Sequence, residues 1–282
     1  MRIVLVCLLF SLIGVCVSGV GRAEDAATLF QEARAASEQG DVPRAMALLS
    51  KAITLAPKNA DLWLVRAQLY DQQGNNTQAL SDYTRALSLD KKLRLAWQRR
   101  GESYFKAGKF AESVADFDAF LRLVPDQKPF HWQRGISLYY AGRFKAGKQQ
   151  FELHQTVNSQ DVENAVWHFL CTVRADGLEA ARKSLIPISE DTRVPMAQVH
   201  QLFAGKARPE EVLSAAQAAT NRSNSNASLF YAYLYLGLYY EALNDKNKAR
   251  EYILKAAERY KGNGYMGEVA RVHANLLRKK RG

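Results

Sequence analysis

The sequence repeats itself with a period of 34 residues. Positions that hold an aromatic, a small residue or a glycine in one stretch hold a residue of the same kind 34 positions further on. Such self-similarity indicates a repeat architecture, in which each unit is one supersecondary element that stacks on the next. The first three sets of matched positions are Ala33, Ala36, Gly40, Ala45, Leu49 and Ala52; then Ala67, Tyr70, Gly74, Ala79, Tyr83 and Ala86; then Gly101, Tyr104, Gly108, Ser113, Phe117 and Phe120.

Two further sets carry the pattern. They are Gly135, Leu138, Gly142, Gly147, Phe151 and His154, and then Leu236, Gly237, Tyr240, Ala249, Ile253 and Ala256. A tryptophan opens three of the units, at Trp63, at Trp97 and, one place late, at Trp132. The pattern resembles the tetratricopeptide repeat (TPR), W-x-x-L-G-x-x-Y followed by A-x-x-x-F and a proline. We therefore expect an all-α protein, a superhelical solenoid of antiparallel helix pairs.

The period also divides the chain. We expect residues 24–161 to hold four repeats, at 26–59, 60–93, 94–127 and 128–161. Residues 162–228 lose the period, although prolines and apolar positions indicate short helices, so we expect an irregular helical segment. Residues 229–282 are expected to hold a fifth repeat at 230–263, a capping helix and a basic tail.

The first 23 residues have the pattern of a secretory signal peptide. Arg2 gives a positive start, residues 3–20 are apolar, and Gly21 and Ala23 are the small residues of a cleavage site. Two alternatives are an uncleaved membrane anchor and a lipoprotein attached at Cys16, although Val15 fits a lipoprotein signal poorly. We expect an exported protein of the periplasm or cell envelope, in contact with a membrane only if it is lipidated or keeps its signal.

Export determines how cysteine content and charge are interpreted. Cleavage would leave Cys171 as the single cysteine, so no disulfide can form within the mature chain. The formal net charge of the whole sequence is +11, part of it in the tail 278–281. A basic protein can bind nucleic acid, but an exported one rarely meets it, so we expect no nucleic-acid partner.

Gly142, Gly147 and Lys148 spell the skeleton of a phosphate-binding loop, G-x-x-x-x-G-K. Such a loop follows a β-strand and needs Ser or Thr after the lysine, where this chain has Gln149. Both glycines also fall on the 34-residue period. We interpret them as a helix corner and a helix contact, and keep a nucleotide-dependent enzyme only as a remote alternative.

No pattern of catalytic, cofactor-binding or metal-binding residues stands out. His168 and Cys171 lie three residues apart on an expected helix, but a structural zinc site needs four ligands. Sequences such as G-x-S-x-G and H-E-x-x-H do not occur. We therefore expect no enzymatic activity, no cofactor and no metal.

The concave face of the stack is the expected functional surface. In TPR proteins the first helix of each repeat lines this face, and exposed aromatic residues there suit an extended segment or helix of a protein partner. The alternative is that Trp132 and Tyr139 pack beneath the segment that follows the fourth repeat. The candidate partner-binding residues are Arg34, Gln68, Gln98, Glu102, Phe105, Trp132, Ile136 and Tyr139.

The stretch 134–143, RGISLYYAGR, is more specific than the general repeat pattern. It resembles the corresponding segment of the NlpI family of bacterial envelope lipoproteins, and residues 202–206 and 235–240 are similar in the same order. The resemblance implies a non-enzymatic, homodimeric adaptor that binds peptidoglycan endopeptidases and a tail-specific protease. This chain departs from the family in its poor lipoprotein signal and in a first repeat that begins almost at the cleavage site.

Together these observations favour an exported, non-enzymatic TPR adaptor or scaffold that binds other envelope proteins, such as cell-wall hydrolases or a tail-specific protease. The alternative from another class is a secretion or assembly chaperone that holds unfolded envelope clients.

Overall fold

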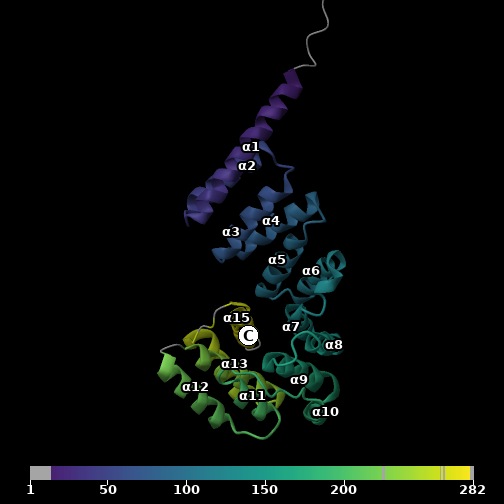
Figure 1. Cartoon of the computed structure of the whole chain (residues 1–282), viewed down its shortest axis with the longest axis vertical. Helices are drawn as coiled ribbons and strands as arrows, with labels where there is room; N and C mark the ends of the chain where they lie inside the picture. The colour runs from purple at the N-terminus through teal and green to yellow at the C-terminus, as the bar shows by residue number, and fades with distance from the viewer. Residues whose placement is uncertain (1–13, 224–225, 261, 263, 280–282) are drawn as a thin grey trace, which may run out of the picture. The chain divides into compact units, whose positions relative to one another are not determined.

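The computed structural model consists of helices joined by turns and by a longer loop at residues 184–195, as Figure 1 shows. It describes residues 14–223, 226–260, 262 and 264–279. Within these residues there is no β-strand, which confirms the expected all-α class. Residues 1–13, which hold most of the expected signal peptide, lie outside the described residues, as do residues 280–282 of the basic tail. Of the helices in the described part, none combines the length and apolar character needed to cross a lipid bilayer.

Backbone contacts divide the chain into two units, one ending at Ser103 and the other beginning at Tyr104. The boundary lies inside the first helix of the third repeat, α5, and not between two repeats. Two smaller apolar clusters form the core of unit 1, and one large cluster forms the core of unit 2.

Unit 1 contains two complete helix pairs and the beginning of a third. Small residues lie where the helices of a pair touch, for example Ala67 and Ala79, which are both fully buried. Tyr83 fills the space beside them and is also fully buried. The helices are α1 (Gly14–Glu38), α2 (Val42–Leu55), α3 (Ala60–Gln72), α4 (Asn76–Leu89) and the first part of α5 (Arg94–Lys106).

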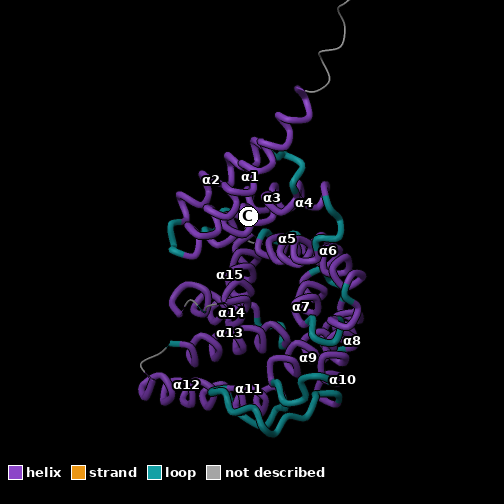
Figure 2. Tube along the Cα trace, turned by 45° about the horizontal axis from the view of Figure 1, so that its top comes forward, coloured by secondary structure: helices purple, strands orange, loops and turns teal. Residues whose placement is uncertain are grey.

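Unit 2 continues from the end of α5 and forms the larger part of the chain (Figure 2). Its helices are α6 (Phe110–Leu123), the 3-10 turn η1 (Pro125–Gln127), α7 (Trp132–Tyr140), α8 (Phe144–Gln155), α9 (Val162–Asp176), α10 (Leu178–Lys183), α11 (Met196–Phe203), α12 (Pro209–Ser223), α13 (Ala227–Ala242), α14 (Lys246–Leu254), the π-helical turn η2 (Lys255–Tyr260) and α15 (Gly264–Lys279).

The corner of each helix pair depends on a left-handed backbone. Gly142 has a φ of +73°, a conformation that costs an L-residue about 1–2 kcal/mol. The N–H of Arg143 then donates to the carbonyl of Leu138 at 2.9 Å, a bond that closes the end of α7. The fifth repeat makes the same corner with Asn244, at a φ of +61°. Three further glycines take this place in the earlier repeats, namely Gly40, Gly74 and Gly108.

Gly135 and Gly147 serve a different purpose, the close approach of neighbouring helices. A Cβ atom at Gly135 would lie 2.6 Å from the ring of Phe151, and one at Gly147 would lie 2.8 Å from the Sγ atom of Cys171. The glycines of the G-x-x-x-x-G-K sequence are thus a helix corner and a helix contact, as expected. A helix, α7, comes before this sequence, and Lys148 Nζ lies 3.2 Å from a carboxylate oxygen of Asp176.

An arginine at one place of the period joins successive repeats within each unit. Arg66, Arg100 and Arg134 stand 34 residues apart on the first helices, and each bonds to a second helix 16 residues away along the chain. The bonds join Arg66 to Ser50 (3.1 Å) and Asp82 (2.7 Å), Arg100 to Thr84 (3.1 Å), and Arg134 to Asp118 (2.6 Å) and Gln150 (3.0 Å). These bonds fix the packing of one pair on the next.

Candidate peptide-binding site

The candidate residues of unit 1 lie on three first helices and are polar. Arg34 on α1 is exposed, and Gln68 on α3 is half-buried. On α5, the side-chain amide of Gln98 donates to Glu102 at 2.9 Å, and Glu102 also accepts from Arg99 at 3.0 Å. The structure thus brings Gln98 and Glu102 together, and a role of these four candidates in partner binding stays a prediction.

The candidates of unit 2 are not an exposed aromatic stripe. Phe105, Ile136 and Tyr139 are buried, with 0%, 1% and 6% of their surface exposed, so the expectation of exposure is wrong for all three. Tyr139 packs edge-on against Trp167 of α9, at a centroid distance of 5.5 Å. This is the alternative packing beneath the segment that follows the fourth repeat. Trp132 alone remains half-buried.

The C-terminal helix contributes to the burial of Phe105 and covers part of Trp132. Tyr265 at the start of α15 stacks on Phe105, with ring centroids 5.2 Å apart, and meets Trp132 edge-on at 5.1 Å. Further along α15, the Nδ1 atom of His273 lies 2.8 Å from the hydroxyl oxygen of Tyr140. The expected cap therefore folds back onto α5 and α7, because its aromatic side chains cover apolar surface that would otherwise face water.

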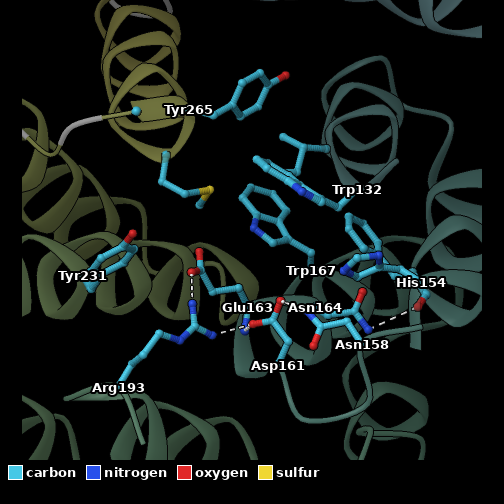
Figure 3. A pocket seen from close by; sticks show the side chains of 14 residues that line it. Trp132, His154, Asn158, Asp161, Glu163, Asn164, Trp167, Arg193, Tyr231 and Tyr265 are labelled. Carbon is cyan, nitrogen blue, oxygen red and sulfur yellow. Dashed lines mark hydrogen bonds and ion pairs between the residues drawn. The ribbon is translucent and has the colours of Figure 1, made fainter. Parts of the chain in front are cut away.

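A pocket of about 390 Å³ lies beside these aromatic contacts, entirely within unit 2 (Figure 3). Helices α7, α8, α9, α13 and α15 contribute to it, together with the turns before α9 and α11. Its lining is aromatic on one side and charged on the other. Its lining includes Trp132, Trp167, Tyr265, Asn158, Asn164, Asp161, Glu163 and Arg193.

Two buried polar groups of the pocket lining have no hydrogen-bond partner in the described structure. Asn164 is 3% exposed; its side-chain nitrogen donates to the carbonyl of Phe151 (3.2 Å) and to Gln155 (2.9 Å), which leaves its oxygen, Oδ1, unpaired. Trp167 is 1% exposed and its indole Nε1–H donates to nothing. A buried polar group without a partner costs about 1–3 kcal/mol, so a side-chain shift that opened these two atoms to the pocket would let a ligand donor and a ligand acceptor offset that cost.

Three carboxylates surround a single guanidinium at the charged side. Arg193 bonds to Asp161 at 2.5 Å, to Asp191 at 2.6 Å and to Glu163 at 2.7 Å. The hydroxyl of Tyr235 also donates to Glu163, at 2.5 Å. With all groups ionised, three negative charges face one positive charge.

Burial and hydrogen bonding act on these carboxylates in opposite directions. Burial raises the pKa of Glu163, against the lowering effect of the Tyr235 hydroxyl and of Arg193. Burial also disfavours the charged form of Asp191, but hydrogen bonds from Arg193 and from the N–H of Val162 hold its pKa below the ordinary value. The hydrogen bonds that Arg193 donates to these carboxylates, above all the one to Asp191, raise the pKa of Arg193, so it stays charged. The charged side of the pocket is therefore a fixed, net-acidic edge.

The sequence pointed to two residues that line this pocket, Trp132 and Ile136, and missed the others. Asn164 carried a usable signal, because it lies three residues before Trp167 and so shares its helix face, where a polar residue among apolar ones is unusual. Arg193 and Tyr265 carried no signal. They reach the pocket from a turn and from the last helix, and only the folded chain brings them to α9.

The metal pair considered from the sequence is part of the core. Cys171 is buried, and burial raises the pKa of its thiol. The Nε2 atom of His168 lies 3.4 Å from a carboxylate oxygen of Glu152 on α8. Over the described residues, no three His, Cys, Asp or Glu side chains gather as a metal site would need.

Comparisons with known proteins support the repeat assignment. One family model, described as "Tetratricopeptide repeat", matches residues 30–93 and 99–152, and a second with the same description matches residues 230–263. No curated protein sequence matches the chain.

Solved structures resemble the fold at low sequence identity. A tetratricopeptide repeat protein from Parabacteroides merdae is similar with a TM-score of 0.62 and 20% identity, over 90% of this chain and 99% of that one. MamA from Desulfovibrio magneticus RS-1 is similar with a TM-score of 0.51 and 12% identity, over 56% of this chain and 90% of that one. With its helix pairs, corner glycines and matched repeats, the chain belongs to the tetratricopeptide repeat family.

Proposed function

We propose that this protein is an exported, non-enzymatic adaptor, and that the pocket of unit 2 holds an extended segment of a partner protein from the cell envelope. Repeat proteins of this kind present large surfaces to other proteins. The observation that carries the proposal is the unpaired pair of groups in the pocket, Asn164 Oδ1 and Trp167 Nε1–H. A peptide backbone offers one donor and one acceptor per residue, so a partner segment carries the groups needed to pair with both atoms once these side chains shift to admit it.

Because α15 packs against the aromatic residues of α5 and α7, the pocket is the place that remains for such a segment. Phe105 and Tyr139, which sequence analysis assigned to a groove, are covered by the chain itself. The pocket remains open beside them and keeps Trp132 half-buried at its edge. A segment that binds there inserts one residue among aromatic side chains, which is the way that most interfaces gain their affinity.

Export and the nature of the clients rest on sequence. The pattern of residues 1–23 supports export. The finer assignment, to cell-wall hydrolases or a tail-specific protease, rests on the resemblance of residues 134–143 and later stretches to the NlpI family. Homodimerisation has the same basis. Fractionation of cells that express the full chain tests export directly, and a cytoplasmic product would contradict it.

Site-specific photo-cross-linking tests the adaptor function. We place the cross-linking residue at Asn158, which is exposed and lines the pocket, and separately at Lys51, which is exposed on α2 of unit 1. The full chain is then irradiated with envelope extract and the adducts are identified by mass spectrometry. We expect the same few envelope proteins in repeated experiments from Asn158 and not from Lys51.

A matched variant connects the adducts to the pocket. Trp167→Phe keeps one ring in place and removes the indole N–H together with the second ring, so it should weaken the Asn158 adducts, at a cost in stability from the cavity that it leaves. If no discrete adduct forms at Asn158, or if Lys51 gives the same proteins, the proposal is wrong.

A further inference from the structure

The tryptophan that opens a repeat is covered by an arginine in unit 1 but not in unit 2. The guanidinium of Arg66 lies 5.0 Å from the ring centre of Trp63, and that of Arg100 lies 5.0 Å from the ring centre of Trp97. In both cases the arginine follows the tryptophan by three residues, so it lies over the ring along one helix face. Arginine stacks well on tryptophan, because the planar cation meets the electron-rich face.

Trp132 breaks this arrangement by a single position. It stands one place late in the period, so Arg134 follows it by two residues and points away from the ring. Arg134 instead bonds to Asp118 and Gln150. Among the described residues, no cationic side chain lies over Trp132, although the ring lines the pocket together with Trp167 (Figure 3). In this repeat the residue three places after the tryptophan is Gly135, which packs against Phe151, so no arginine of the same helix face can cover Trp132.

The negative charge at the edge of the pocket is complementary to a guanidinium group. Asp161 and Glu163 line it, and with Asp191 they share one guanidinium, that of Arg193. The side chains of Asp161 and Glu163 are 18% and 16% exposed, so their charge is only partly screened by water. A second cation at this edge would lower the electrostatic cost of the excess negative charge.

We propose that the pocket recognises an arginine side chain of the bound segment. Its guanidinium stacks on Trp132 and faces Asp161 and Glu163, while the adjoining peptide unit donates to Asn164 Oδ1 and accepts from Trp167 Nε1–H. This inference rests on the proposed function, because it names the residue that the same pocket reads in a partner segment. Lysine fits less well, since its compact ammonium neither stacks as a plane nor forms paired bonds to carboxylates.

Fluorine NMR tests the inference with the full chain and a minimal probe. The protein has four tryptophans, of which Trp63 and Trp97 belong to unit 1 and Trp132 and Trp167 line the pocket. All four are labelled as 5-fluorotryptophan and assigned by single Trp→Phe variants. The probe is N-acetyl-arginine-methylamide, which carries a guanidinium and peptide units on both sides, and the matched control is the neutral citrulline analogue.

We expect the arginine probe to shift the Trp132 and Trp167 signals in a saturable way and to leave Trp63 and Trp97 unchanged. The citrulline analogue should bind at least ~10-fold more weakly, a factor that corresponds to about 1.4 kcal/mol. Asp161→Asn should reduce this preference, and it should fold normally, because asparagine replaces aspartate well as the N-cap of α9.

Equal binding of both probes, or no shift at Trp132 and Trp167, would overturn the inference. Neither NMR result would contradict the adaptor function, because that proposal is tested by the cross-linking experiment. Adducts at Asn158 without a preference for arginine would mean a partner segment of another chemistry.

Discussion

Tyr265 of α15 stacks on Phe105 of α5, with ring centroids 5.2 Å apart and ring planes 26° from parallel. The contact joins α15 to the end of α5, where unit 2 begins. It covers the aromatic residues that an isolated repeat would expose toward a partner. The C-terminal helix therefore completes the core of unit 2. The surface that stays open to a partner is the neighbouring pocket.

Replacement of Tyr265 by alanine should loosen α15. The variant loses ring contacts with both Phe105 and Trp132, and we expect the free energy of unfolding to fall by about 2–3 kcal/mol. Hydrogen exchange measured by mass spectrometry should be faster across residues 264–279. Tyr265→Phe keeps the ring and serves as the control. Unchanged exchange in the alanine variant would show that the stacking does not hold α15.

Gly135 and Phe151 form a size-matched pair. A Cβ atom at Gly135 would come within 2.6 Å of the Phe151 ring, so Gly135→Ala should destabilise the protein by about 1–3 kcal/mol. Phe151→Leu alone should also be destabilising, because it leaves a cavity at a fully buried position.

The double variant tests the pairing. Since the smaller leucine makes room for the methyl group, Gly135→Ala with Phe151→Leu should cost less than the sum of the two single changes, as measured by urea denaturation. Additive costs would mean that the helices adjust in another way.

The sequence predicted the repeats well, because the repeat pattern is local. Each corner glycine, each small contact residue and each filling aromatic belongs to one helix pair, and the period brings equivalent positions into register. The same period also contained the joining arginines Arg66, Arg100 and Arg134, which can be recognised once their partners 16 residues away are considered.

The site could not be predicted in the same way, because it depends on contacts that no period encodes. The burial of Phe105 depends on Tyr265, and the acidic edge depends on Arg193. Tyr265 lies far along the chain from Phe105, as Arg193 does from Asp161 and Glu163, and both lie outside the first four repeats. Exposure of a helix face is a property of everything packed against it, so a stripe inferred from the repeat alone was wrong for Phe105, Ile136 and Tyr139.

Gly142 should tolerate asparagine better than alanine. Its φ of +73° is strained for alanine, and no neighbouring atom lies within 4 Å of an added Cβ, so the expected cost of about 1 kcal/mol comes from the backbone alone. Asn244 already takes the equivalent place at a φ of +61°, so Gly142→Asn should cost less. Urea denaturation of the two variants measures the difference. A larger loss in the asparagine variant would mean that the corner requires glycine for another reason.

His131 should make the protein less stable in mild acid. The ring caps α7, since its Nδ1 atom accepts from the N–H of Arg134 at 3.2 Å, and it packs against Phe117 with ring centroids 4.6 Å apart. Burial lowers the pKa of His131 from its ordinary 6.5 to about 4. Between these two values the unfolded chain binds more protons at this site than the folded chain, so stability falls as the pH falls.

The loss due to His131 should be about 2 kcal/mol between pH 7 and pH 5, measured as the free energy of unfolding in urea at each pH. His131→Asn supplies a matched control, because an asparagine side chain also caps a helix but does not titrate. The variant starts from a lower stability at pH 7, since it loses the ring contact, but its dependence on pH should be weaker. Part of the dependence should remain, because burial lowers the pKa of His168 in the same direction. If the variant and the parent lose the same stability between pH 7 and pH 5, His131 is not the group that titrates.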